Sequence, residues 1–115
     1  MLDINAEDIH QFWFQEIKRE YWWEKNGEFD DQLRSRFGNL LEAAKRCELH
    51  QWRDTAIGRL AEIIVLDQFS RNIFRDTAEA FAADPLALAL TQEAIREGAD
   101  EALSADQRAF LYMPM

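Results

Sequence analysis

The stretch IIVLDQFSRNIFR, residues 63–75, decides the fold, because it is among the most apolar runs of the chain and yet carries several polar side chains. On a helical wheel of about 100° per residue, apolar side chains occupy both sides. One face holds Leu60, Ile63, Ile64 and Phe74, and the other holds Val65, Leu66, Phe69 and Ile73. A helix that is apolar nearly all round packs on more than one side. The stretch therefore predicts a central helix.

Asp67 and Arg71 stand four residues apart on one face of this helix, with the acid toward the N-terminus, which is the favourable order for a helical ion pair. Buried charges are tolerated only when they are paired and hydrogen-bonded, so we expect these two side chains to neutralise each other. One interpretation is a polar pair that fixes how the helices dock. The other is a concave pocket for an anion, a carboxylate or a peptide terminus, lined by Arg71, Arg75 and Asn72, because guanidinium groups suit planar ligands. In that pocket we expect Arg75 to bind ligand without contributing to stability.

Helix signals continue toward the N-terminus. Asn5 precedes AEDIHQFWFQEI and is predicted to be an N-cap. Asp30 is predicted to open an amphipathic segment that extends to Trp52. Gly38 lies inside that segment at a cost of about 1 kcal/mol relative to Ala, which suggests a close approach of another helix.

Toward the C-terminus, Asp54 is predicted to cap the central helix, and Asp84 to cap a helix that has Pro85 at its first position and Gly98 at its end. A last helix follows the capping-box pair of Ser104 and Gln107. With short loops between them, these segments predict an all-α fold of five or six helices arranged as antiparallel helical hairpins.

Composition limits the class of protein. The 115 residues form one domain by length, and 48% of them are hydrophobic, which is enough for a core. The net charge of −9, with interspersed basic residues, argues against binding nucleic acid or an anionic membrane surface. No apolar run could span a membrane, and the acidic start lacks the features of a secretory signal. Cys47 is the single cysteine and cannot form an internal disulfide, so we expect a soluble protein of the cytoplasm.

Tryptophans concentrate in the N-terminal half. Trp22 and Trp23 are adjacent, so they cannot both face the core of a helix, and at least one should be partly exposed. An exposed tryptophan beside arginine and asparagine side chains is typical of a recognition groove. We therefore add Trp22 and Trp23 to the candidate ligand-binding residues Asp67, Arg71, Asn72 and Arg75.

Motifs for metal, cofactor or nucleophilic chemistry are not found. His10 and His50 are the only histidines, and they lack the spacing of a metal-binding motif. Ser70 lacks the glycines of a nucleophile elbow, and the four glycines form no phosphate-binding loop. We expect neither a metal nor a cofactor, and the sequence leaves open whether the protein is an enzyme.

Long parts of the chain resemble the sequences of a known protein family. RLAEIIVLDQFSRNIFRDTAEAFAADPLALALTQEAIREG and ADEALSADQRAFLYMPM, with FWF at 12–14 and FDDQLRSRFGNLLEAA, resemble a family of bacterial proteins catalogued as domain of unknown function 924. The resemblance covers almost the whole chain and implies a helical fold similar to that of tetratricopeptide-repeat proteins, without their sequence signature. It implies no reaction. Family members continue past the Tyr-Met-Pro stretch into further helices, so we expect residues 1–115 to lack the C-terminal helices of the family.

From these features we expect a binding or scaffold module for a peptide or a small acidic ligand; this step uses an analogy between folds. Two alternatives stay open. The first is an enzyme acting on a small metabolite, with Asp67 and Arg71 in its pocket and His10 as a proton carrier. The second is a unit that self-associates through its apolar C-terminal segment AFLYMPM.

Overall fold

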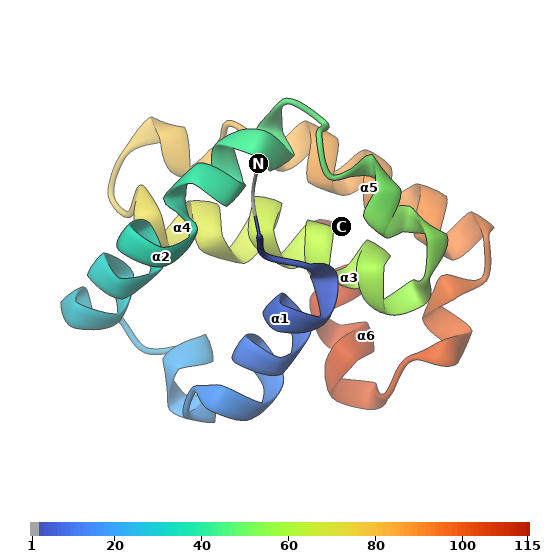
Figure 1. The fold of residues 1–115 in the computed structure, drawn as a ribbon, viewed down its shortest axis with the longest axis horizontal. Helices are drawn as coiled ribbons and strands as arrows, with labels where there is room; N and C mark the ends of the chain where they lie inside the picture. Colours follow the sequence, from blue (N-terminus) through green and yellow to red (C-terminus); the bar gives the residue numbers. More distant parts are fainter. Residues whose placement is uncertain (1–2) are drawn as a thin grey trace.

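A central helix runs through the middle of the molecule in the computed structural model, which describes residues 3–115 (Figure 1). It comprises α3 (Ala56–Ile64), a π-helical segment (Val65–Phe69) and α4 (Ser70–Ile73). Every residue from 61 to 70 is buried, as expected for a helix that is apolar on all sides. The predicted central helix is confirmed.

Four helices surround the central helix, namely α1 (Ala6–Gln11), α2 (Gly27–Lys45), α5 (Asp84–Arg96) and α6 (Ala105–Tyr112). α1, α5 and α6 pack against α3, whereas α2 packs against the π-helical segment and α4. Figure 1 shows the central helix lying between α2 and α5 on one side and α1 and α6 on the other. Residues 3–115 contain no strand, so the all-α fold is confirmed, and the tetratricopeptide-like stacking of hairpins stays a prediction.

Short helical turns connect these helices. α1 runs into a π-helical segment, and four 3-10 turns lie between the longer helices. Their bounds are Phe12–Glu16 for the π-helical segment and Arg19–Trp22, His50–Asp54, Ala78–Phe81 and Ala99–Ala102 for the turns. π-Helical turns occur often at functional sites, and the one within the central helix contains Asp67.

Aromatic rings link the N-terminal segment to the central helix. Phe12 packs edge-on against Phe37 of α2 at 4.9 Å between ring centroids, and Phe37 stacks on Phe69 at 5.2 Å. Trp13 meets Phe110 of α6 edge-on at 5.6 Å. Such pairs add about 0.5–1.5 kcal/mol beyond the burial of their surface. This cluster holds α1, α2 and α6 around the central helix.

Several helix ends differ from the predictions. Asn5 is the predicted N-cap and also forms a capping box with Asp8, and the Ser104–Gln107 pair forms the predicted capping box. Gly98 takes the left-handed backbone conformation (φ 74°) just past the end of α5. The predicted starts at Asp30, Asp54 and Asp84 are wrong as caps. Asn26 caps α2 and Thr55 caps α3, while α5 has Ala83 at its N-cap position without a side-chain bond. Asn and Thr side chains accept the capping hydrogen bond as well as Asp does, so residue type alone does not decide which of several neighbouring polar residues caps a helix.

The expected close approach at Gly38 is also wrong. A Cβ atom built on Gly38 would meet nothing within 4 Å. The close approach occurs at Gly58 in the first turn of α3, where a Cβ atom would overlap the Trp52 carbonyl oxygen. Gly58 thus permits the turn His50–Asp54 to pack closely against the start of α3.

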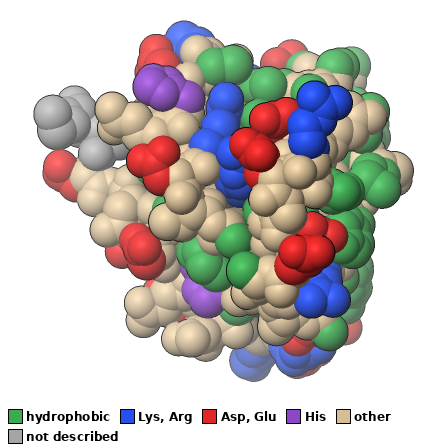
Figure 2. Space-filling view, turned by 90° about the vertical axis from the view of Figure 1, so that its right-hand side faces the viewer, with side chains coloured by type: hydrophobic (Ala, Val, Ile, Leu, Met, Phe, Trp, Pro, Cys, Tyr) green, Lys and Arg blue, Asp and Glu red, His purple; other side chains and the backbone are tan. Residues whose placement is uncertain are grey.

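Charges of both signs are interspersed on the face shown in Figure 2, where no broad basic patch is visible. This agrees with the interspersed basic residues of the sequence. Among residues 3–115, no helix combines the length and apolarity that crossing a bilayer requires.

Candidate functional site

The predicted ion pair of Asp67 and Arg71 forms on the central helix. Arg71 Nε donates to Asp67 Oδ1 at 3.2 Å, and its Nη2 lies 3.1 Å from the same oxygen. The Asp67 side chain is 2% exposed, but the Arg71 side chain is 41% exposed. The pair is confirmed, and the expectation that both partners are buried is wrong, because the long arginine side chain carries its guanidinium to the surface.

Gln68 completes the environment of the buried carboxylate. Its Nε2 donates to Asp67 Oδ2 at 2.9 Å and also contacts Met113 Sδ at 3.2 Å. Asn72, one turn further along the helix, is 8% exposed, and its side-chain amide has no hydrogen-bond partner within residues 3–115. Both Asp67 oxygens therefore accept a hydrogen bond, one from Arg71 and one from Gln68.

The outer end of Arg71 is positioned but not saturated. Its guanidinium carbon lies 5.2 Å from the ring centroid of Phe81, which is 55% exposed. Asp84, at the start of α5, approaches Arg71 Nη2 to 3.6 Å, too far for a hydrogen bond. An exposed guanidinium, an aromatic ring and a carboxylate thus lie together at the junction of α4 and α5.

Electrostatics at this cluster follow from burial. Burial raises the pKa of Asp67 above its ordinary value, and the hydrogen bonds and charge of Arg71, with the bond from Gln68, offset this only partly. The charge of Asp84 raises the same pKa further. Two carboxylates around one guanidinium leave the cluster with a net negative charge when both are ionised.

Arg75 has a different environment from the one expected. Its Nε and Nη2 donate to the two oxygens of Asp30 at 2.7 and 3.1 Å, a bidentate pair that joins α2 to the end of the central helix. The Asp30 side chain is 9% exposed. Asp30 therefore lies inside α2 as a partner of Arg75, and the expectation that Arg75 contributes nothing to stability does not fit this geometry.

The side chains of Trp22 and Trp23 have different environments. Trp22 is 8% exposed and donates from Nε1 to the Trp13 carbonyl oxygen at 2.9 Å, whereas Trp23 is 67% exposed and stacks on Phe110 at 5.8 Å. The expected exposure of at least one of them is confirmed. No hydrogen bond or ring contact within residues 3–115 joins either of them to Arg71.

His10 lies apart from the Asp67–Arg71 pair. Its Nε2 is 2.7 Å from Gln107 Nε2 of α6, and its ring packs against Phe14 at 5.1 Å. No hydrogen bond within residues 3–115 connects it to Asp67 or Arg71. The described residues also contain no cluster of three potential metal ligands.

The C-terminal segment packs largely onto its own chain. Phe110 and Leu111 are 2% and 0% exposed, and Met115 is 69% exposed. Tyr112, Met113 and Pro114 are partly exposed, and self-association through AFLYMPM stays a prediction.

A second ion pair with a buried carboxylate, besides Asp30–Arg75, was missed by sequence reasoning. Arg53 Nε and Nη2 each donate to a Glu62 oxygen at 2.8 Å, and Glu62 is 1% exposed. The signal was the position of Glu62 inside the apolar run LAEIIV of a central helix, where an ionised group needs a partner. The partner, nine residues earlier, lies beyond helical spacing.

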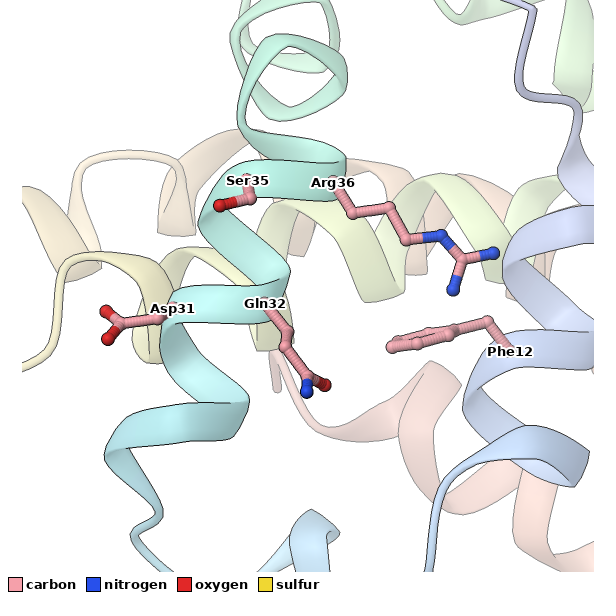
Figure 3. A pocket seen from close by; sticks show the side chains of 5 residues that line it. All are labelled: Phe12, Asp31, Gln32, Ser35 and Arg36. Atoms are coloured by element: carbon pink, nitrogen blue, oxygen red, sulfur yellow. The ribbon is translucent and has the colours of Figure 1, made fainter.

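Two surface cavities lie on α2, away from the predicted site. The larger, about 920 Å³, lies between the second half of α2 and residues 48–52. Of its charged side chains, Arg46 and Glu48 pair with each other at 3.0 Å, and Glu42 pairs with Lys45 at 3.3 Å. The smaller, about 410 Å³, is lined by Phe12, Asp31, Gln32, Ser35 and Arg36, as Figure 3 shows. Sequence reasoning singled out neither.

Comparison with known proteins identifies the family. The model of the family "Bacterial protein of unknown function (DUF924)" matches residues 9–115, so the chain belongs to this family. A solved structure of a protein of unknown function, ATU0120 from Agrobacterium tumefaciens, is 44% identical and superposes with a TM-score of 0.90 over 95% of this chain. The chain spans 61% of that structure's length. None of the curated proteins compared with the chain matches it.

Proposed function

We propose that this member of the DUF924 family is a binding module that holds a peptide at the junction of α4 and α5, through Arg71. The observation that carries the proposal is the state of the Arg71 guanidinium. Asp67 fixes the guanidinium from within the core, and the Arg71 side chain stays 41% exposed beside the exposed ring of Phe81. A donor that is held in place and left unsaturated is suited to a ligand, because less side-chain freedom is lost on binding.

The charges around Arg71 favour a peptide over a small acidic ligand. Asp67 and Asp84 lie 3.1 and 3.6 Å from Arg71 Nη2, so a free anion would meet two carboxylates as well as one guanidinium. A peptide offers both carbonyl oxygens for Arg71 and N–H groups for Asp84. The unpaired amide of Asn72 could satisfy the same backbone groups.

The proton-transfer chemistry of an enzyme has less support at this site. Asp67 is the only buried carboxylate in the cluster, and both of its oxygens already accept hydrogen bonds from Arg71 and Gln68. A general base must reach the proton that it takes. These bonds support a structural and orienting role for Asp67, with Arg71 as the contact to ligand.

The cytoplasmic location expected from the sequence stays a prediction.

Selection from a random peptide library tests the proposal. We expect wild-type protein to enrich a defined group of peptides, and a synthetic peptide from that group to bind with a Kd measurable by fluorescence polarisation. Arg71→Gln should weaken binding at least tenfold, because Gln can still bond Asp67 but offers no outward guanidinium. Arg96→Gln is the matched control, since Arg96 is an exposed arginine of α5, and it should bind as the wild type does.

Failure to enrich any peptide, or equal affinity for wild type and Arg71→Gln, would refute the proposal. Thermal melts of both variants, monitored by circular dichroism, confirm that each is folded during the measurement. Asp84→Asn provides a further check, because loss of its charge should weaken a peptide that donates to it.

A further inference from the structure

The smaller cavity on α2 is lined by one aromatic residue, Phe12, which is 6% exposed, and by Arg36. Figure 3 shows Arg36 extending from α2 toward the segment that carries Phe12, with the guanidinium beside the Phe12 ring. Gln32, one turn earlier on α2, points toward the same space. The cavity of about 410 Å³ lies within the range of small-molecule sites, about 300–1,000 Å³.

The Arg36 guanidinium packs against two aromatic rings and makes no hydrogen bond through its N–H groups within residues 3–115. Its guanidinium carbon lies 5.1 Å from the Phe12 ring centroid and 4.9 Å from that of Phe37. The nearest carboxylate, on Glu16, is 3.7 Å from Nη1, beyond hydrogen-bond distance. Within residues 3–115 the Arg36 side chain donates no hydrogen bond, in contrast to Arg53, Arg71 and Arg75. Cation–π contacts therefore orient the group, and its N–H groups make no hydrogen bond within these residues although Glu16 lies nearby.

The other charge at the cavity is already neutralised. Asp31 accepts a hydrogen bond from Arg34 at 2.7 Å, and Figure 3 shows its side chain pointing away from Phe12. Arg36 thus meets one carboxylate, that of Glu16 at 3.7 Å, whereas Arg71 meets two. An anionic ligand would be attracted here, although the chain as a whole carries a net charge of −9.

From this arrangement we infer that the cavity between α2 and Phe12 is a second ligand site, which binds a small monocarboxylate with an aromatic body. The carboxylate binds to the donor edge of Arg36, in the bidentate geometry that a guanidinium offers. The aromatic body packs against Phe12, and the Gln32 amide contacts the polar end. This site is separate from the proposed peptide site, because it lies on α2 and uses none of the residues around Arg71.

A titration of ¹⁵N-labelled protein with phenylacetate tests the inference. Two other probes separate the contribution of the carboxylate from that of the aromatic ring. Phenylacetamide has the ring without the charge, and acetate has the charge without the ring. We expect phenylacetate to shift the amide signals of Gln32, Ser35 and Arg36 and to reach saturation. Each of the other two should bind at least tenfold more weakly.

Variants then assign the contact. Arg36→Gln should weaken phenylacetate binding at least tenfold, and Arg36→Lys should lie between this variant and the wild type, because Lys keeps the charge without the bidentate donors. Arg71→Gln and Arg96→Gln should bind phenylacetate as the wild type does. The Arg36 side chain is 54% exposed, so we expect its variants to fold.

The inference would be overturned by shifts scattered over the surface without saturation, by phenylacetamide or acetate binding as tightly as phenylacetate, or by unchanged binding of phenylacetate to Arg36→Gln. Loss of binding in Arg71→Gln would place the ligand at the other site and would contradict the inference as well.

Discussion

Arg75→Ala should destabilise the protein, because it leaves the buried carboxylate of Asp30 without its ion-pair partner. Asp30 accepts two hydrogen bonds from Arg75, at 2.7 and 3.1 Å, and its side chain is 9% exposed while that of Arg75 is 28% exposed. Breaking a fully buried ion pair costs about 3–5 kcal/mol, and an exposed pair contributes about 0–1 kcal/mol. This pair lies between the two limits, nearer the first, so we expect a loss of about 2–3 kcal/mol. For a domain of this size the melting temperature should fall by about 8–12 °C.

Urea unfolding followed by tryptophan fluorescence measures this loss directly. Arg96→Ala is the control, because Arg96 is exposed, and it should change the free energy of unfolding by less than about 0.5 kcal/mol. In a double-mutant cycle, Asp30→Ala combined with Arg75→Ala should cost less than the sum of the two single changes, by about 1–3 kcal/mol. Equal stability of Arg75→Ala and Arg96→Ala would show that the pair does not hold α2 to the central helix, and would refute this reasoning.

Three further predictions concern the core and its buried polar groups. Gly58→Ala should lower the free energy of unfolding in urea by at least about 2 kcal/mol, because its Cβ would overlap the Trp52 carbonyl oxygen. Gly38→Ala should raise it by up to about 1 kcal/mol, and a similar effect of both substitutions would contradict the packing around α3. Because burial raises the pKa of Asp67, the folded state binds its proton more readily than the unfolded chain does, so this group's contribution makes the free energy of unfolding fall as pH rises from about 3.8 through the folded-state pKa. Asp67→Asn should remove that part of the pH dependence, and parallel stability–pH curves for variant and wild type would argue against the raised pKa. Ser70→Ala should leave the melting temperature unchanged or raise it, because the buried Ser70 hydroxyl has no hydrogen-bond partner among the described residues; a large drop would show that the hydroxyl is bonded.

The central helix was predictable because the signals for it are local. A run of apolar residues without a polar face demands burial on every side, and two opposite charges four residues apart can meet on any helix. Both conclusions need only the geometry of one element. The all-α fold follows in the same way from capping residues and helical periodicity.

The pairing partners were not predictable, because they depend on how separate helices meet. Arg75 lies 45 residues from Asp30, and nothing in their spacing indicates that they are neighbours. The same holds for Arg36, whose position over Phe12 depends on the approach of α2 to the N-terminal segment. Exposure was also misjudged for Arg71, because its Cβ lies on an apolar face while its long side chain reaches the surface.

The most direct test of the proposed function is the side-chain NMR signal of Arg71. If Asp67 fixes one side of the guanidinium and leaves the other free, the Arg71 Nε–H signal should exchange slowly with water at neutral pH. In Asp67→Asn it should exchange faster, and addition of a selected peptide should shift the Arg71 Nη signals of the wild type. A rapidly exchanging Nε–H signal that is the same in Asp67→Asn, with no response to peptide, would contradict both the buried anchor and the site built on it.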